Sequence, residues 1–328
     1  MENKNYAVGI IGCGMILKRH LEAIDKNDKF YLVSLCDIDE LKRPKEINVP
    51  FYKDYRKMID EQQINFVVVA TPNNQHYDQA IYALKNGCDV LIEKPAVLNP
   101  SLLNIIQSEA KKNGQRAYCV LQVRLNPVVQ KIKDLLSSGK LGKIRGFSLV
   151  QRWQRPKEYF NGWRGAPKTG GGILHECGIH YLDILCYLLG KPEVIGSKYY
   201  NTKHTNVDIE DTIYSILDMG EYGGTAEVTI ASEPKNIECS ISIMTDKGYI
   251  KLGGKALSEI EKYDFIDSEK INYDEFNIRL PNSYVNYQGS CPNHPDLYRR
   301  MESFDINETI DVIYLIDDIY KSARLKYY

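Results

Sequence analysis

The sequence predicts an α/β chain with two parts: a parallel sheet covered by helices, then an α+β domain with a large, mainly antiparallel open sheet. The first prediction rests on near-continuous apolar runs, such as NFVVVA at 65–70, that alternate with helical segments. The second rests on long alternating runs between 194 and 266, joined by short polar or glycine turns. We expect the first domain to span residues 1–122 and the second to span residues 123–328.

The expected elements follow in a regular order. In the first domain, strands are predicted at 6–11, 30–36, 65–70, 89–93 and 117–121, with helices between them. The second domain opens with a helix at 127–142, a strand at 146–153 and a helix that starts after the glycines at 170–172. Its remaining strands are predicted at 196–204, 211–219, 224–232, 237–245 and 248–253. A last helix at 307–324 is expected to pack back near the first domain.

Composition narrows the class of protein. Apolar residues make up 43% and charged residues 26%, which fits a globular protein. A net charge of -1 argues against nucleic acid or an anionic membrane as a partner. No run is long and apolar enough to span a bilayer, and the start of the chain lacks a signal-peptide core. A cytoplasmic location is therefore predicted.

Cysteines and histidines give no sign of disulfides or metal. The cysteines are scattered without a C-x-x-C pair, so we expect free thiols. The histidines form no H-x-x-x-H pair and no H-E-x-x-H motif, so no metal site is predicted.

The stretch GIIGCGMILKRH follows the first strand and opens a helix. Gly12 permits a tight turn, and Gly14 lets the backbone approach a pyrophosphate at the helix N-terminus, although Leu17 replaces the third glycine of the usual fingerprint. Met15 and Ile16 continue this candidate cofactor loop. A plain glycine turn is the alternative, but the position between the first strand and the first helix favours a dinucleotide.

Asp37 ends the second strand, 23 residues after Gly14. A carboxylate there accepts hydrogen bonds from ribose hydroxyls and repels a 2′-phosphate, so NAD is favoured over NADP. Lys42 and Arg43 lie nearby and leave NADP open.

Polar residues also follow the next strands, at the edge where ligands of such folds collect. ATPNNQH at 70–76 and IEKPAVLNP at 92–100 are the two segments. An ordinary turn and a solvated lysine are the alternatives. The remaining candidate cofactor residues are Thr71, Asn73, His76, Glu93, Lys94 and Gln122.

The segment GGGILHECGIHYLDILCYLLG is predicted to form a mainly apolar helix with polar residues along one face. Glu176, His180 and Asp183 fall at i, i+4 and i+7 and therefore share a face. We interpret Asp183 as structural, a partner for a backbone or basic group. For an isolated histidine, a buried hydrogen-bonded network without chemistry would be the better interpretation.

G-x-G-x-x-x-x-x-H, the strand-end Asp, ATPN, EKP and GGG-x-x-x-E-x-G-x-H-x-x-D, in this order, resemble the Gfo/Idh/MocA oxidoreductase family. The resemblance covers nearly the whole chain, and its specific parts are EKP and G-x-H-x-x-D. It implies an N-terminal Rossmann domain, a C-terminal sheet used for oligomerisation, and hydride transfer between a sugar or polyol carbon and NAD(P).

The resemblance assigns the catalytic roles to Lys94 and His180. A neutral His180 would take the hydroxyl proton, and the Lys94 ammonium would stabilise the developing alkoxide and lower the pKa of the imidazole. Glu176 stands where the family commonly has Asp, and we expect it to orient either the sugar or the base.

Two further segments are similar to family members that act on sugars and sugar nucleotides. QRWQRPKEYFNGWRGAPKTGGG at 151–172 is one, and SCPNHPDLY at 290–298 resembles enzymes that oxidise UDP-N-acetyl-glucosaminuronate at C3. There Arg124 would also approach the site. Packing under the sheet and surface exposure are the alternatives for the tryptophan and the arginines of the first segment. The candidate substrate residues are Arg155, Tyr159, Trp163, Arg164, His180, His294 and Tyr298.

Three functions remain open from the sequence. The first is an NAD-dependent dehydrogenase of a sugar or sugar nucleotide, and C3 of a UDP-N-acetyl-hexuronate is the carbon considered. The second is a 3-ketosugar reductase or a polyol dehydrogenase of the inositol type. The third is a non-catalytic regulator that binds NAD or sugar, against which the retention of Lys94 and His180 argues. The long C-terminal strands predict a homodimer or homotetramer built sheet against sheet.

Overall fold

The computed structural model describes residues 5–254, 256–266 and 293–325, and its contacts divide the chain into two compact units. One unit comprises Met1–Leu121 and Pro292–Ile310, and the other comprises Gln122–Cys291 and Asp311–Tyr328. Every cysteine within the described ranges is a free thiol, as predicted, and Cys291 lies outside them. None of the helices in these ranges combines the length and the apolar character needed to cross a membrane.

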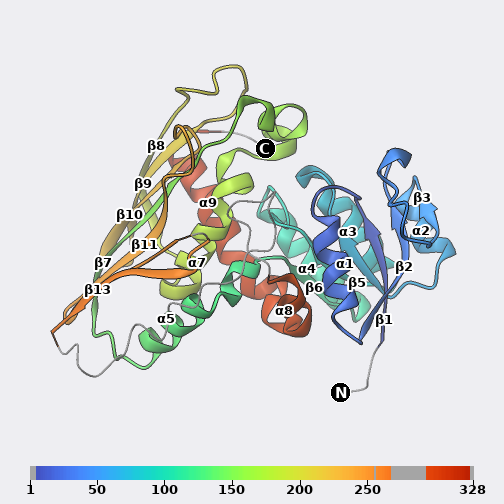
Figure 1. The fold of residues 1–328 in the computed structure, drawn as a ribbon, viewed down its shortest axis with the longest axis horizontal. Helices are drawn as coiled ribbons and strands as arrows, with labels where there is room; N and C mark the ends of the chain where they lie inside the picture. The colour runs from blue at the N-terminus through green and yellow to red at the C-terminus, as the bar shows by residue number, and fades with distance from the viewer. Residues whose placement is uncertain (1–4, 255, 267–292, 326–328) are drawn as a thin grey trace. The chain divides into compact units, whose positions relative to one another are not determined.

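The first unit contains a sheet in the order β3-β2-β1-β4-β5-β6, in which every pair of neighbours is parallel. Both β4 and β5 are buried at every residue, which requires cover on both faces of the sheet. Helices α1 to α4 provide this cover (Figure 1), so the predicted parallel sheet is confirmed. The strands are β1 (Tyr6–Ile11), β2 (Phe30–Cys36), β3 (Phe51–Tyr52), β4 (Phe66–Val69), β5 (Asp89–Ile92) and β6 (Ala117–Cys119). The helices are α1 (Leu17–Asp25), α2 (Tyr55–Glu61), α3 (His76–Lys85) and α4 (Ser101–Asn113).

The segment 292–310 belongs to the first unit although it lies far along the chain. Its helix α8 (His294–Arg299) packs against α1. A guanidinium nitrogen of Arg116 lies 3.2 Å from a carboxylate oxygen of Glu302, and Tyr118 forms an isolated backbone bridge with Asp305. A late part of the sequence therefore helps to build the first unit.

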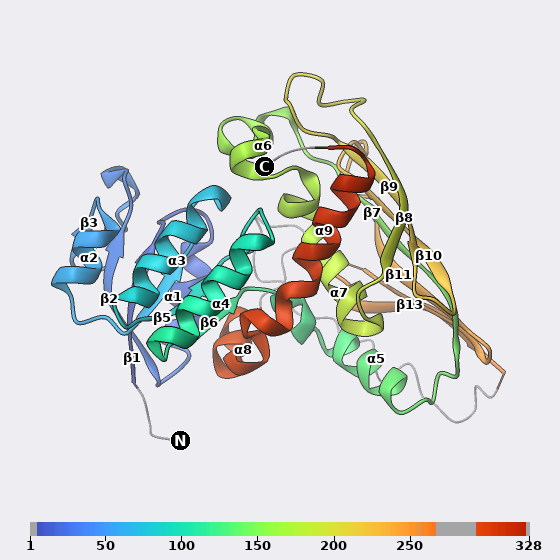
Figure 2. The ribbon, with the colours of Figure 1, turned by 180° about the vertical axis from the view of Figure 1, so that it is seen from behind.

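The second unit is built on a sheet in the order β13-β12-β11-β7-β10-β9-β8. Its neighbours are antiparallel except for the parallel pair β10 and β7, which agrees with the predicted mainly antiparallel sheet. Helices α5 (Pro127–Ser137), α7 (Ile179–Leu189) and α9 (Ile310–Ser322) lie on one face of it (Figure 2). The strands are β7 (Ile144–Arg152), β8 (Glu193–Tyr200), β9 (Thr212–Asp218), β10 (Gly223–Thr229), β11 (Glu238–Thr245), β12 (Gly248–Gly253) and β13 (Glu259–Phe265).

Four local features differ from the sequence prediction. The short β3 and the edge strand β13 were not predicted. The predicted helix after the glycines begins as a π-helical turn, η6 (Leu174–Gly178), before α7 starts at Ile179. The last α-helix starts at Ile310 rather than at residue 307, because a 3₁₀ turn (Ile306–Thr309) precedes it.

The sheet face opposite these helices is not uniformly apolar, which refines the expected oligomer surface. A ladder of alternating charges crosses five adjacent strands of this outer face. Arg152 lies 2.6 Å from Glu227 and 3.3 Å from Glu238, and Lys251 lies 2.8 Å from Glu238 and 3.1 Å from Glu261. The exposed apolar side chains gather instead toward the other edge, on β8 and β9. They include Ile195 (59% exposed), Tyr214 (46%) and Ile216 (58%).

We propose that this apolar edge of the outer face binds a second copy of the chain, because exposed apolar patches of this kind are normally covered. Ile216→Glu places a charge in the middle of the patch and should shift the protein to a monomer at micromolar concentration. Ile38→Glu, at a position of the first unit that is 84% exposed, should leave the mass in solution unchanged. Light scattering that finds the unaltered protein monomeric would contradict the proposal.

Candidate active site

The glycine loop connects β1 to α1. Gly12 has a positive φ of 100°, and a Cβ there would stand 2.4 Å from the carbonyl oxygen of Ala70, so only glycine fits. At Gly14 a Cβ would meet no atom within 4 Å, and the residue is exposed. The backbone at Gly14 is therefore accessible to a ligand.

The start of α1 suits a pyrophosphate. Its N-cap position, Ile16, makes no capping bond with its side chain, and the first turn holds no acidic residue. The first amide groups of such a helix point outward and favour an anion. Met15 is 62% exposed beside them. These residues fit the diphosphate of a dinucleotide.

Asp37 sits at the end of β2 and is almost buried. One of its carboxylate oxygens accepts a hydrogen bond from the Cys13 amide at 2.8 Å, and the other accepts one from the Asp39 amide at 2.9 Å. Each oxygen retains a further lone pair for a ribose hydroxyl. Lys42 lies 3.6 Å from Asp37 and offsets part of its charge. Lys42 is one of the two basic residues because of which the sequence did not exclude NADP.

The polar loop after β4 is tied to the loop after β5. His76 is buried, with one ring nitrogen 2.8 Å from the Pro95 carbonyl oxygen and the other 2.9 Å from the Thr71 carbonyl oxygen. Asn73 is buried as well, and the Thr71 hydroxyl donates to Gln79 at 2.7 Å. Of the cofactor residues expected here, His76 therefore braces the backbone, whereas Thr71 keeps partial exposure.

Lys94 has an unusual degree of exposure for its surroundings. Between Cys88 and Leu98, Lys94 alone is partly exposed, and all the remaining residues are buried. Its backbone has left the ladder of β5, and its amide donates to the Glu93 carboxylate at 3.2 Å. The fold thus places the side chain of Lys94 at the carboxyl edge of the parallel sheet.

His180 shows the same pattern in the second unit. Gly171 and Gly172, both with positive φ, turn the chain into η6, and from Gly170 to Cys186 only His180 is partly exposed. A π-helical turn such as η6 often marks a functional site in a helix. Because η6 is not α-helical, Glu176 and His180 do not follow the strict i, i+4 line that we expected.

Glu176 is held by two of the predicted substrate residues. Its Oε1 accepts a hydrogen bond from the Tyr159 hydroxyl at 2.7 Å and from Arg164 Nε at 2.8 Å. Burial and the nearby Glu176 charge raise the pKa of Tyr159 well above its usual value, so this phenol keeps its proton and donates it. Glu176 therefore acts as an acceptor inside a network.

Aromatic rings and guanidinium groups surround this network. Arg164 stacks over Trp163 at 4.4 Å and over Tyr159 at 5.2 Å. Arg155 stacks over Trp153 at 4.4 Å and over Tyr159 at 5.4 Å. The structure thus brings Arg155, Tyr159, Trp163 and Arg164 together in one unit beside Glu176.

Arg155 differs from Arg164 in its partners. Within the residues that the structure describes, no carboxylate lies within ion-pair distance of Arg155, whose guanidinium donates to the Gln154 carbonyl at 2.8 Å. It is nevertheless partly buried. A partly buried cation is usually paired, so Arg155 is a candidate ligand for an anionic group.

Asp183 has the structural role that the sequence predicted. It is fully buried and accepts from Arg124 Nε at 2.8 Å and from a second guanidinium nitrogen of the same arginine. Arg124, which we expected to approach a substrate, is thereby committed to a buried ion pair and stacks over Tyr187.

The late residues His294 and Tyr298 lie in the first unit. Both are buried, at 1% and 3% exposure, and the Tyr298 hydroxyl lies 2.9 Å from His20 Nδ1. His294 Nε2 lies 3.6 Å from Glu93 Oε1. His20 is the histidine of the motif G-x-G-x-x-x-x-x-H, but the sequence alone assigned it no role in the site. Gln122, also buried, completes the predicted set.

Comparisons with protein families match both halves of the chain. Residues 6–121 match the model of an oxidoreductase family with an NAD-binding Rossmann fold, and residues 129–251 match the GFO/IDH/MocA C-terminal domain. Oxidoreductase P35 of Formosa agariphila is 30% identical over 71% of this chain and 75% of its own length. D-glucoside 3-dehydrogenase of Escherichia coli is 28% identical over 59% of this chain and 57% of its own length.

Solved structures match over nearly the full length. The WlbA dehydrogenase of Bordetella pertussis, in complex with NADH and UDP-GlcNAcA, has a TM-score of 0.90 and 26% identity, covering 99% of this chain and 97% of that one. The WlbA dehydrogenase of Chromobacterium violaceum, with the same two ligands, has a TM-score of 0.86 and 25% identity, covering 99% and 95%.

The Asp37 carboxylate predicts the choice of cofactor. We expect NADH to bind more tightly than NADPH, because a buried carboxylate at the ribose repels a 2′-phosphate. Asp37→Ser should narrow the difference between the two dissociation constants, measured by fluorescence titration. Glu40→Ser, which removes an exposed acid three residues further on, is the matched control and should not. Equal affinities in the unaltered protein would refute this assignment.

Proposed function

Because the chain belongs to the Gfo/Idh/MocA family of oxidoreductases, we propose that it is an NAD-dependent dehydrogenase that oxidises C3 of a UDP-N-acetyl-hexuronate. The family membership carries the reaction class, which is hydride transfer at a sugar carbinol carbon. The likeness to two WlbA dehydrogenases in complex with NADH and UDP-GlcNAcA supports the narrower substrate.

The observation that carries the catalytic assignment is the exposure of two side chains. Lys94 and His180 are the partly exposed residues of two otherwise buried stretches, 88–98 and 170–186. An ionisable side chain that stays accessible in such a stretch can reach a ligand, while its buried neighbours keep water away from the rest of the segment. We interpret both groups as kept for chemistry.

The proposed chemistry follows from these two groups. NAD, when bound, supplies the hydride acceptor. His180, as the neutral imidazole, takes the proton from the sugar hydroxyl while the carbon loses its hydride. The Lys94 ammonium stabilises the negative charge that develops on the oxygen. Glu176, already hydrogen-bonded to Tyr159 and Arg164, keeps these two side chains in place rather than taking a proton itself.

The charges of the second unit support an anionic substrate. Glu176 offsets the charge of Arg164, whereas Arg155 has no such carboxylate among the described residues. We propose that Arg155 binds the carboxylate or the diphosphate of the substrate, for which a guanidinium offers two parallel donors. Trp163 and Tyr159 offer rings on which the sugar or the base stacks.

The direct test is formation of NADH with a panel of UDP-GlcNAcA, UDP-GlcNAc, glucose and myo-inositol. The proposal expects turnover of UDP-GlcNAcA and much slower reaction of the other three. Preferred turnover of myo-inositol would replace it with a polyol dehydrogenase. Tight binding of NADH and UDP-GlcNAcA without any turnover would make the protein a binding module.

His180→Asn tests the base. We expect turnover to fall by about two to four orders of magnitude, the usual contribution of a positioned general base. The dissociation constant for NADH should change little, because the imidazole acts on the hydroxyl of the substrate. Near-normal turnover in this variant would transfer the role of base to Lys94.

Glu176→Gln is the comparison for the base variant. The amide still accepts from Tyr159 and Arg164, so we expect turnover within about tenfold of the unaltered enzyme. A loss as large as that of His180→Asn would instead show that the two residues work as a coupled pair.

Arg155→Gln tests the anion site. Loss of a charge-assisted hydrogen bond should raise KM for UDP-GlcNAcA by about 10- to 100-fold and leave KM for uncharged sugars unchanged. Arg152→Gln is the matched control, since Arg152 lies three residues earlier and is paired with Glu227 and Glu238. Equal effects of the two substitutions would argue against a substrate contact.

A further inference from the structure

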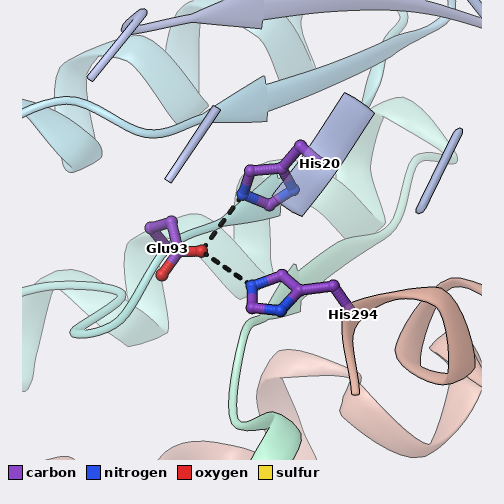
Figure 3. Close-up of side chains that lie close together, drawn as sticks. All are labelled: His20, Glu93 and His294. Atoms are coloured by element: carbon purple, nitrogen blue, oxygen red, sulfur yellow. Dashed lines mark hydrogen bonds and ion pairs between the residues drawn. The ribbon is translucent and has the colours of Figure 1, made fainter. Parts of the chain in front are cut away.

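A buried network in the first unit joins three separate elements: α1, the end of β5 and α8 (Figure 3). Glu93 Oε1 lies 3.1 Å from His20 Nε2 and 3.6 Å from His294 Nε2. The other ring nitrogen of His20 lies 2.9 Å from the Tyr298 hydroxyl. All four residues of this network are buried, with exposed fractions of at most 9%. Such an arrangement needs a reason, because burying a carboxylate with two imidazoles is costly.

The direction of each hydrogen bond follows from the charges. Burial raises the pKa of Glu93, but the two imidazoles beside it outweigh this and hold the pKa well below its usual value, so Glu93 is an acceptor. Burial and the Glu93 charge raise the pKa of Tyr298 well above its usual value, so Tyr298 is a donor. With His20 as the neutral imidazole, its Nδ1 accepts from the Tyr298 hydroxyl and its Nε2–H donates to Glu93.

The second carboxylate oxygen of Glu93 connects the network to the backbone of Lys94. Glu93 Oε2 accepts from the Lys94 amide at 3.2 Å, at the residue where the chain leaves β5. On the other side, the Pro95 carbonyl oxygen lies 2.8 Å from His76 Nδ1. The backbone of Lys94 is therefore fixed from both sides by buried side chains.

A metal ion does not account for the cluster as well. His20, Glu93 and His294 form a group of three in the described part of the chain, whereas a structural zinc site takes four protein ligands and a catalytic one keeps an open position. The cluster is buried, and the second oxygen of Glu93 is already used by the Lys94 amide.

We propose that His20 and Tyr298 are positioning residues for Lys94 and act through the carboxylate of Glu93, with His294 as the second imidazole that packs against it. The proposal rests on the proposed function, in which Lys94 contacts the reacting oxygen. It gives the late segment 292–310 a part in the chemistry, since α8 supplies Tyr298 and His294.

Tyr298→Phe is the sharpest variant, because it removes one hydroxyl and keeps the buried ring. Tyr118→Phe is the matched control: Tyr118 is a buried tyrosine of the same unit whose hydroxyl faces Arg116 rather than His20. Both variants should lose a similar, small amount of thermal stability. Only Tyr298→Phe should lower kcat with UDP-GlcNAcA, by about tenfold, with KM for NAD unchanged.

A double-variant cycle separates positioning from general loosening. In a Lys94→Ala background, Tyr298→Phe should change kcat by less than about twofold, since the group that it positions is gone. A residue that acts only on stability would lower kcat by the same factor in both backgrounds, and that result would overturn the proposal.

Amide hydrogen exchange gives a readout that needs no substrate. Exchange at the Lys94 amide, followed in a peptide covering residues 89–98, should be faster in Tyr298→Phe than in Tyr118→Phe. If the unaltered protein oxidises none of the sugars, the proposed function fails and this measurement alone decides the positioning role. Equal exchange in the two variants would overturn it. Stoichiometric bound zinc, lost in His294→Gln, would overturn it in favour of a metal site.

Discussion

The level register of four parallel strands is the constraint on which the first unit depends. Ile11 is paired with Cys36 on one side and with Val69 on the other, and Val69 is paired with Ile92. The next residue of each strand therefore leaves the sheet at the same edge: Gly12, Asp37, Ala70 and Glu93. A slip of one residue in any of these strands would move the residue that follows it away from this edge, so the loops of the site depend on the register.

Buried polar groups then fix the direction of the side chains at that edge. Asp37 is bound by two backbone amides, and His76 and Glu93 hold the backbone around Lys94. In the second unit, Asp183 is paired with Arg124, and Glu176 is bound by Tyr159 and Arg164. A buried polar group must find partners, so each of these contacts also removes freedom from a neighbouring loop.

The sequence was sufficient for the features that depend on local pattern. The strands β1 and β2 have the predicted bounds, because continuous apolar runs between polar turns have few other solutions. Asp183 was predicted to be structural from its place one turn beyond His180. The two-residue β3 carries too little pattern to be seen, and the π-helical turn at 174–178 has no composition that distinguishes it from an α-helix.

Features that depend on distant pairs could not be predicted. The contact between His20 and Tyr298 joins residues 278 positions apart, and the sequence around either residue does not indicate that the two are partners. The charge ladder of the outer sheet face is a similar case. Alternation places Arg152, Glu227 and Glu238 on one face, but only the strand order and register decide which charges become neighbours.

At Glu176, the π-helical turn and the longer side chain together determine which residues the carboxylate contacts. The π-helical turn moves residue 176 away from the line that an α-helix would give it relative to His180. A longer side chain than the aspartate common in this family reaches Tyr159 and Arg164, which come from 17 and 12 residues earlier in the chain. A guanidinium and a phenol already donate to one oxygen of this carboxylate. In the proposed mechanism, the partly exposed imidazole of His180 therefore takes the proton, and the carboxylate keeps the surrounding side chains in place.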